Sequence, residues 1–169
     1  MDKEKIKIML VDDEENIRRA LKRILKRDGY NVVVYGNPEE ALKSFSAEEP
    51  DIVISDYLMP EMNGVDFLKK AQDIFPECIR IILTAHADVT MAVEAINTTG
   101  IFRLLVKPWD DKELKMLLQQ INEHMAIIKE NAKLRSIIRK HEEILKKLEV
   151  EYPGISEIKR LPDGTIVIE

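Results

Sequence analysis

Five short apolar runs alternate with longer helix-like segments in the N-terminal part of the chain, and this alternation restricts the possible folds more than any other feature. The runs are rich in β-branched residues and lie at residues 6–10, 31–35, 51–55, 79–83 and 103–106. Each run is almost continuously apolar, which is typical of parallel strands covered by helices on both faces. The sequence therefore predicts an α/β fold with a doubly wound, five-stranded parallel sheet.

Helix signals lie between these predicted strands. The first helix is expected at about residues 15–28, the third at 64–74, and the fifth from about Asp110. Pro38 is suited to the first turn of the second helix, and Asp88 can cap the fourth. We therefore expect five β-α units.

Composition and charge argue against several classes of protein. The formal net charge of −5 comes from intermixed acidic and basic residues, so we do not expect direct nucleic-acid binding. Cys78 is the only cysteine, which excludes an internal disulfide and fits a reducing compartment. The charged N-terminal stretch and the absence of a long apolar run predict neither a signal peptide nor a membrane span. We expect a cytoplasmic protein.

Polar residues that can carry chemistry follow the predicted strands. Asp12 and Asp13 come after the first strand, Asp56 ends the third, Thr84 follows the fourth, and Lys107 follows the fifth. In open parallel sheets, ligands bind at the carboxyl ends of the strands. We therefore expect three carboxylates, one hydroxyl and one ammonium group to meet there.

This set of side chains indicates phosphoryl chemistry. Clustered carboxylates raise one another's pKa unless a cation is present, which favours a hard divalent ion such as Mg²⁺. Asp12 and Asp13 are adjacent and suited to the metal, so Asp56 is the candidate nucleophile that would form an acyl phosphate. Charge neutralisation would come from the metal, from Lys107 and from the hydroxyl of Thr84.

Four stretches resemble one known family, the receiver domains of bacterial response regulators, over residues 4–122. They occur in that family's order and spacing: MLVDDEENIRRAL at 9–21, DYLMPEMNG at 56–64, ILTAHAD at 82–88 and LVKPWDDKEL at 105–114. The resemblance implies a flavodoxin-like fold with strand order 2-1-3-4-5. It also implies a phosphorylation switch, with little catalysis beyond its own phosphorylation, that accepts its phosphoryl group from a sensor histidine kinase or a phosphotransfer protein.

The resemblance also implies residue roles. Asp56 would be the phospho-acceptor, and Mg²⁺ would be bound by Asp12 or Asp13 together with Asp56 and the Leu58 carbonyl. Thr84 would be the switch hydroxyl.

The resemblance further implies that Lys107 pairs with the phosphate and precedes a cis peptide bond to Pro108. Family members usually carry an aromatic residue three positions before this lysine, where the present chain has Leu104. Phe102 lies two residues earlier, so coupling between Thr84 and an aromatic side chain is not expected here.

The helical pattern continues far beyond one crossover helix. We divide the chain into a receiver domain at 1–122, a coiled-coil helix at 123–150 and a β-hairpin at 151–169. The heptad a and d positions are His124, Ile127, Asn131, Leu134, Ile138, His141, Leu145 and Leu148. This pattern favours a parallel homodimer, although extra isoleucines leave antiparallel packing or a higher oligomer open.

Two other functions compete with a stand-alone regulator. The chain could be the input domain of a longer regulator, because the KPWDD sequence is similar to that of receivers attached to HD-type phosphodiesterases. A haloacid dehalogenase phosphatase also uses an aspartyl phosphate, but it normally has Asp-x-Asp after the first strand. Val11-Asp12-Asp13-Glu14 lacks that spacing.

Overall fold

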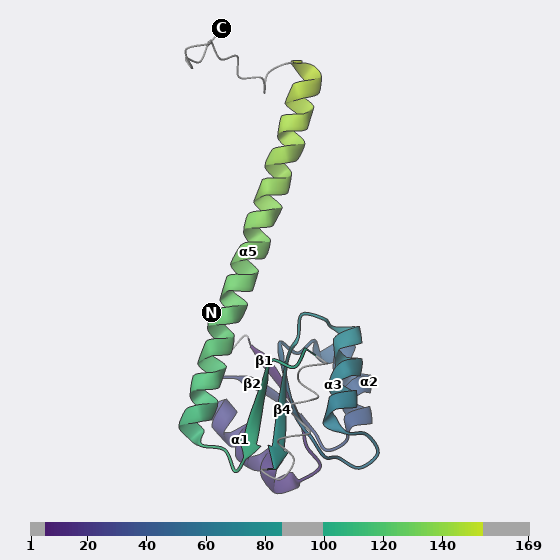
Figure 1. Ribbon diagram of the computed structural model, residues 1–169, viewed down its shortest axis with the longest axis vertical. Helices are drawn as coiled ribbons and strands as arrows, with labels where there is room; N and C mark the ends of the chain where they lie inside the picture. The colour runs from purple at the N-terminus through teal and green to yellow at the C-terminus, as the bar shows by residue number, and fades with distance from the viewer. Residues whose placement is uncertain (1–5, 86–99, 154–169) are drawn as a thin grey trace. The chain divides into compact units, whose positions relative to one another are not determined.

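A five-stranded, all-parallel sheet forms the centre of the first part of the chain, as predicted (Figure 1). The structure is a computed structural model that describes residues 6–85 and 100–153. The strand order is β2-β1-β3-β4-β5, the flavodoxin-like order that the sequence resemblance implies. The strands are β1 (Lys7–Val11), β2 (Asn31–Tyr35), β3 (Ile52–Asp56), β4 (Ile79–Ala85) and β5 (Arg103–Lys107).

Helices cover both faces of the sheet, which is why its strands are almost entirely apolar. In the described residues the helices are α1 (Glu15–Arg27), α2 (Pro38–Glu48), α3 (Gly64–Ile74) and α5 (Asp111–Glu151). One face packs against α2 and α3 through a buried cluster that includes Met9, Phe45, Val53 and Phe67. The other face is covered by α1 and the first turns of α5 (Figure 1).

The helix boundaries agree closely with the sequence prediction. The third helix occupies residues 64–74 as predicted, and the first ends one residue earlier than expected, at Arg27. Asp28 caps that helix, and the next residue, Gly29, has a φ of 92°, the left-handed conformation that glycine tolerates. The proposed cap at Asp88, the fourth helix and, apart from residues 151–153, the C-terminal hairpin predicted at 151–169 lie outside the described residues.

The chain divides after Asn122 into two compact units, and α5 belongs to both. In the second unit the helix carries exposed apolar side chains, among them Leu134, Ile138 and Leu145 at predicted a and d positions. The helix ends at Glu151, directly before the Tyr152-Pro153-Gly154 stretch that predicts a break. Within the described part of the chain, every helix is too short or too polar to cross a bilayer.

Glu49 offers a test of backbone strain at the end of α2. It has a φ of 44°, a left-handed conformation that is unfavourable for a residue with a Cβ atom, and its side chain is exposed. We expect Glu49→Gly to raise the free energy of unfolding by about 0.5–1 kcal/mol, measured by urea denaturation. Ala47→Gly, inside the same helix, should instead lower it by about 1 kcal/mol. Equal effects of the two substitutions would contradict the proposed backbone strain at Glu49.

Candidate phosphoryl-acceptor site

Three carboxylates meet at the carboxyl end of the sheet. Asp12 and Asp13 follow β1, Asp56 is the last residue of β3, and one oxygen of each lies within 4.8 Å of the others. These residues are brought together because β1 and β3 are hydrogen-bonded neighbours that run in the same direction. Asp12 is fully buried and Asp56 is 6% exposed, whereas Asp13 is exposed.

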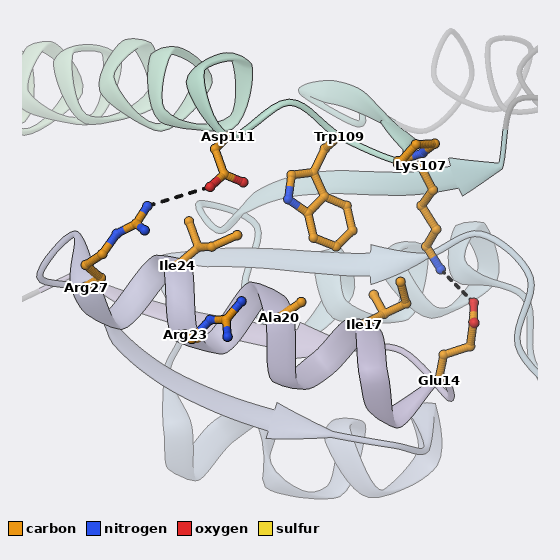
Figure 2. Close-up of a pocket in the computed structure, with 10 residues that line it drawn as sticks. Glu14, Ile17, Ala20, Arg23, Ile24, Arg27, Lys107, Trp109 and Asp111 are labelled. Carbon is orange, nitrogen blue, oxygen red and sulfur yellow. Dashed lines mark hydrogen bonds and ion pairs between the residues drawn. The ribbon is translucent and has the colours of Figure 1, made fainter.

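Lys107 links the acids into one network. Its Nζ atom lies 2.8 Å from Asp56 Oδ1, 2.9 Å from Asp12 Oδ2 and 3.3 Å from Glu14 Oε1. The lysine is the last residue of β5, and its side chain is 13% exposed. Figure 2 shows it extending from β5 toward Glu14. One ammonium group therefore neutralises part of a cluster of several acids.

Burial and charge oppose each other in this network. Burial raises the pKa of both Asp12 and Asp56, and hydrogen bonds from Lys107 reduce that rise without cancelling it. Burial alone would lower the pKa of Lys107, but its bonds to Asp12 and Asp56 outweigh this effect and raise that pKa. Three carboxyl groups thus share one ammonium group, and burial makes unbalanced charge on Asp12 and Asp56 costly.

The acid cluster fits a hard divalent cation. A cavity of about 270 Å³ lies beside it, and Asp13, Asp56, Leu58 and Lys107 are among the residues that line it. Carboxylate and carbonyl oxygens are the ligands that Mg²⁺ prefers, and the surplus negative charge favours its binding. The side chains of Asp12, Asp13 and Asp56, with the main chain at Leu58, could hold the ion.

Thr84 differs from its predicted position. It lies inside β4, which continues to Ala85 because Thr84 and Ala85 pair with Val106 and Lys107 of β5. The Thr84 side chain is buried, and its hydroxyl donates to the Ala85 carbonyl at 3.2 Å. Ala85 lines the 270 Å³ cavity. The hydroxyl is thus held by its own strand in this state.

The connection after Asp56 is tightly constrained. Tyr57 N–H donates to the Leu83 carbonyl at 2.7 Å, and Gly64 N–H donates to the Tyr57 carbonyl at 2.8 Å. A Cβ atom at Gly64 would overlap the carbonyl oxygen of Asp56, so α3 can begin this close to Asp56 only with glycine. On the opposite side of the site, the Lys107-Pro108 peptide bond is cis, as the sequence resemblance implies.

Two residues near the site were not selected from the sequence. Glu14 contacts Lys107, and its N–H donates to Asp12 Oδ1 at 2.8 Å. Arg18 donates to the main-chain carbonyls of Asp12 and Asp13. Glu14 continues the acidic run after β1 and could have been noticed for that reason. Arg18 gave no comparable signal, because its contacts depend on how the loop folds back toward α1.

A second cavity, of about 560 Å³, adjoins the site between α1 and the segment after β5 (Figure 2). We call it the α1 groove. Its lining residues are Glu14, Ile17, Ala20, Arg23, Ile24, Arg27, Lys107, Pro108, Trp109 and Asp111. Trp109 faces the apolar side chains of α1, and Lys107 and Glu14 belong to both this groove and the acid cluster (Figure 2). A protein that reaches Asp56 from this side would cover apolar surface.

Comparison with known proteins gives one consistent family. The model of the response regulator receiver domain matches residues 8–119. The chain is 36% identical to the regulatory protein AtoC of Escherichia coli over 124 residues, covering 73% of this chain and 27% of that protein. It is 30% identical to the DNA-binding transcriptional regulator NtrC of Proteus hauseri over 154 residues, covering 91% of this chain and 32% of that protein. The chain thus spans about a third or less of these two relatives.

Solved structures give the same result. A response regulator receiver domain protein from Clostridium thermocellum superposes with a TM-score of 0.67 at 30% identity, covering 73% of this chain and 98% of that one. The signal receiver domain of an HD domain-containing protein from Pseudomonas fluorescens gives a TM-score of 0.68 at 35% identity, covering 74% and 92%. Both similarities cover most of the neighbour's chain.

Proposed function

Because the chain belongs to the response regulator receiver domain family, we propose that it accepts a phosphoryl group on Asp56 in a Mg²⁺-dependent reaction. The donor would be a sensor histidine kinase or a phosphotransfer protein. The observation that carries the proposal is the position of Asp56 Oδ1, 2.8 Å from Lys107 Nζ and beside two further acids. That arrangement supplies a nucleophile, a cation and ligands for a metal.

In the proposed reaction, a carboxylate oxygen of Asp56 attacks the phosphorus of a phosphohistidine. The P–N bond of the donor breaks as the O–P bond forms, and the imidazole keeps the electron pair and gains a proton from solvent. A bound Mg²⁺ would neutralise the phosphoryl oxygens, and Asp12, Asp13 and the Leu58 carbonyl would hold it together with Asp56. Lys107 already neutralises charge beside Asp56 and would pair with the phosphate.

Phosphorylation would then shift an existing equilibrium between two conformations. It adds about two negative charges and three acceptor oxygens at Asp56. The Thr84 hydroxyl would leave the Ala85 carbonyl, which it now contacts at 3.2 Å, for a phosphoryl oxygen. Leu104 is only partly buried and carries no ring to follow that movement. The surface formed by β5 and α5 would change, and α5 continues through residues 123–150.

Intact-mass measurement with acetyl phosphate and Mg²⁺ tests the acceptor directly. The wild-type chain should gain one phosphoryl group, and Asp56→Asn should gain none because the nucleophilic carboxylate is missing. Asp51→Asn is the matched control, since Asp51 lies just before the start of the same strand, where its Oδ2 accepts from Lys7 N–H. It should be phosphorylated like wild type. A phosphorylated Asp56→Asn, or an unmodified wild type, would refute the proposal.

The alternatives predict different behaviour in the same assay. A haloacid dehalogenase phosphatase would release inorganic phosphate continuously, whereas we propose one phosphoryl group per chain with slow hydrolysis. The input-domain alternative is supported by the length of the relatives and by the HD domain-containing neighbour. NtrC of Proteus hauseri is a DNA-binding regulator. For the present residues we propose no direct contact with nucleic acid. The full reading frame would show whether an effector domain is present.

We further propose that residues 123–150 form a parallel coiled coil with a second copy of the chain. Leu134, Ile138 and Leu145 are 48%, 55% and 55% exposed in the single chain, although they occupy core positions of the heptad pattern. An apolar stripe of this length needs a partner.

Polar residues favour a parallel dimer over other assemblies. Asn131 at an a position favours a dimer in register, and Glu130 and Arg135 can pair between two identical helices.

Charge placed in the seam should separate the dimer. We expect twice the chain mass for wild type in light scattering, and the single-chain mass for Leu134→Glu/Ile138→Glu, because two carboxylates per chain cannot be buried in the seam. Lys140→Glu introduces the same side chain at an exposed position between seam residues and should remain dimeric. The proposal fails if wild type is monomeric or if the double variant keeps the wild-type mass.

A further inference from the structure

Arg18 contacts the backbone of both residues of the acidic loop. It lies in the first half of α1, where a single guanidinium nitrogen, Nη1, donates to the Asp12 carbonyl at 2.6 Å and to the Asp13 carbonyl at 2.7 Å. The side chain is half-buried. Lys107 neutralises the carboxylate of Asp12, so Arg18 and Lys107 hold different parts of the same loop.

The guanidinium group of Arg18 is itself confined. A Cβ atom added at Gly36, in the connection after β2, would lie 3.1 Å from Arg18 Nη1 and 3.2 Å from its Cζ. The residue before Gly36, Tyr35, accepts a hydrogen bond from Asp12 N–H at 3.2 Å. The Asp12-Asp13 loop is therefore fixed from two sides, and Gly36 leaves the space in which Arg18 lies.

Fixing this loop matters because its two carboxylates repel each other. Metal ligands must be held to within about 0.5 Å of their binding geometry, and groups that orient them typically change metal affinity by 10–100-fold. The Asp12 carboxylate is oriented by the Glu14 N–H at 2.8 Å. The main chain that carries Asp12 and Asp13 is oriented by Arg18.

We propose that Arg18 is a positioning residue for divalent-metal binding: it fixes the main chain of Asp12 and Asp13 so that their carboxylates can share one cation. This inference rests on the metal site of the proposed function. A role of Arg18 in orienting the loop and a role through its charge predict opposite effects of its removal on metal affinity. As a cation, Arg18 repels a metal ion, so its removal would tighten binding if its charge were all that mattered. If Arg18 acts by orientation, its removal weakens binding.

Binding of Mn²⁺ separates the two effects. Mn²⁺ accepts the same oxygen ligands as Mg²⁺, and its free ion is counted by electron paramagnetic resonance. We expect Arg18→Met to weaken Mn²⁺ binding about tenfold or more, and Arg18→Lys to restore part of the affinity. Arg19→Met is the matched control. The Arg19 side chain is 75% exposed, pairs with Glu15 on the helix surface and should leave the affinity unchanged.

Gly36→Ala displaces the guanidinium group without removing its charge, and should also weaken Mn²⁺ binding, by less than Arg18→Met. In the double variant the two effects should not add, because both act through the same contact. If wild type binds Mn²⁺ and Arg18→Met binds it as tightly or more tightly, the inference alone is overturned. If wild type binds no Mn²⁺, the proposed metal site and this inference fail together.

Discussion

Replacing Lys107 by methionine is expected to lower the free energy of unfolding by about 3–5 kcal/mol in metal-free buffer, because it leaves buried carboxylates without their cation. Asp12 is fully buried, Asp56 is 6% exposed, and the lysine lies within 3 Å of both. Methionine keeps most of the apolar stem, so the lost charge dominates the effect. Urea denaturation at neutral pH measures it.

Two companion variants identify the cause. Lys115→Met removes a lysine from an exposed position on α5 and should change the free energy of unfolding by less than about 0.5 kcal/mol. Adding Asp56→Asn to Lys107→Met should recover much of the loss, because it removes one of the unpaired charges. Saturating Mg²⁺ should stabilise Lys107→Met more than wild type. A loss below 1 kcal/mol for Lys107→Met would show that water already screens the carboxylates.

The way in which the free energy of unfolding depends on pH follows from the pKa shifts of the two buried acids. Burial raises the pKa of Asp12 and Asp56 above their unfolded values, so the folded state binds protons more tightly than the unfolded state. The destabilisation caused by their ionised forms is therefore present at neutral pH and is relieved as the pH falls through the folded pKa values. Without Lys107 these pKa values rise further. The difference in the free energy of unfolding between Lys107→Met and wild type should therefore become smaller as the buffer is made more acidic.

The sequence predicted the acid cluster because topology alone brings it together. Asp12 follows the first apolar run and Asp56 ends the third. Parallel neighbouring strands place such residues at one edge of the sheet. Once the runs were recognised as parallel strands, no side-chain detail was needed. The same reasoning located Lys107 at the end of β5, although it could not give the 2.8 Å contact with Asp56.

The structural features that the sequence did not predict depend on tertiary contacts. The end of β4 was placed before Thr84, but pairing with β5 extends it to Ala85. Such pairing is decided by the neighbouring strand and has no local signal. Arg18 looked like any charged residue on an exposed helix face, because its carbonyl partners in the loop become reachable only when the chain folds back. Gly64 begins the helix predicted at 64–74, but its close approach to the Asp56 carbonyl oxygen likewise has no local signal.

Gly64→Ala should therefore be more harmful than the sequence suggests. A Cβ atom at this position overlaps the Asp56 carbonyl oxygen and also approaches Ser55 Oγ. We expect the free energy of unfolding to fall by about 2–3 kcal/mol, the usual cost of overpacking a closely packed site. The start of α3 must move away from β3, which displaces Asp56. The initial rate of phosphorylation by acetyl phosphate should fall about a hundredfold, as expected for a misplacement of about 1 Å.

A substitution at a second glycine distinguishes a loss of stability from a displacement of Asp56. Gly100 has a φ of 62° and lies before β5, at the edge of the sheet opposite Asp56, where its carbonyl accepts from Arg80 Nη2. Gly100→Ala should cost about 1–2 kcal/mol through backbone strain. Its phosphorylation rate should remain at the wild-type value, because the acceptor is undisturbed. If both variants lose stability and phosphorylation in proportion, the slower reaction reflects partial unfolding, and the close approach of Gly64 to Asp56 has no separate role in positioning the acceptor.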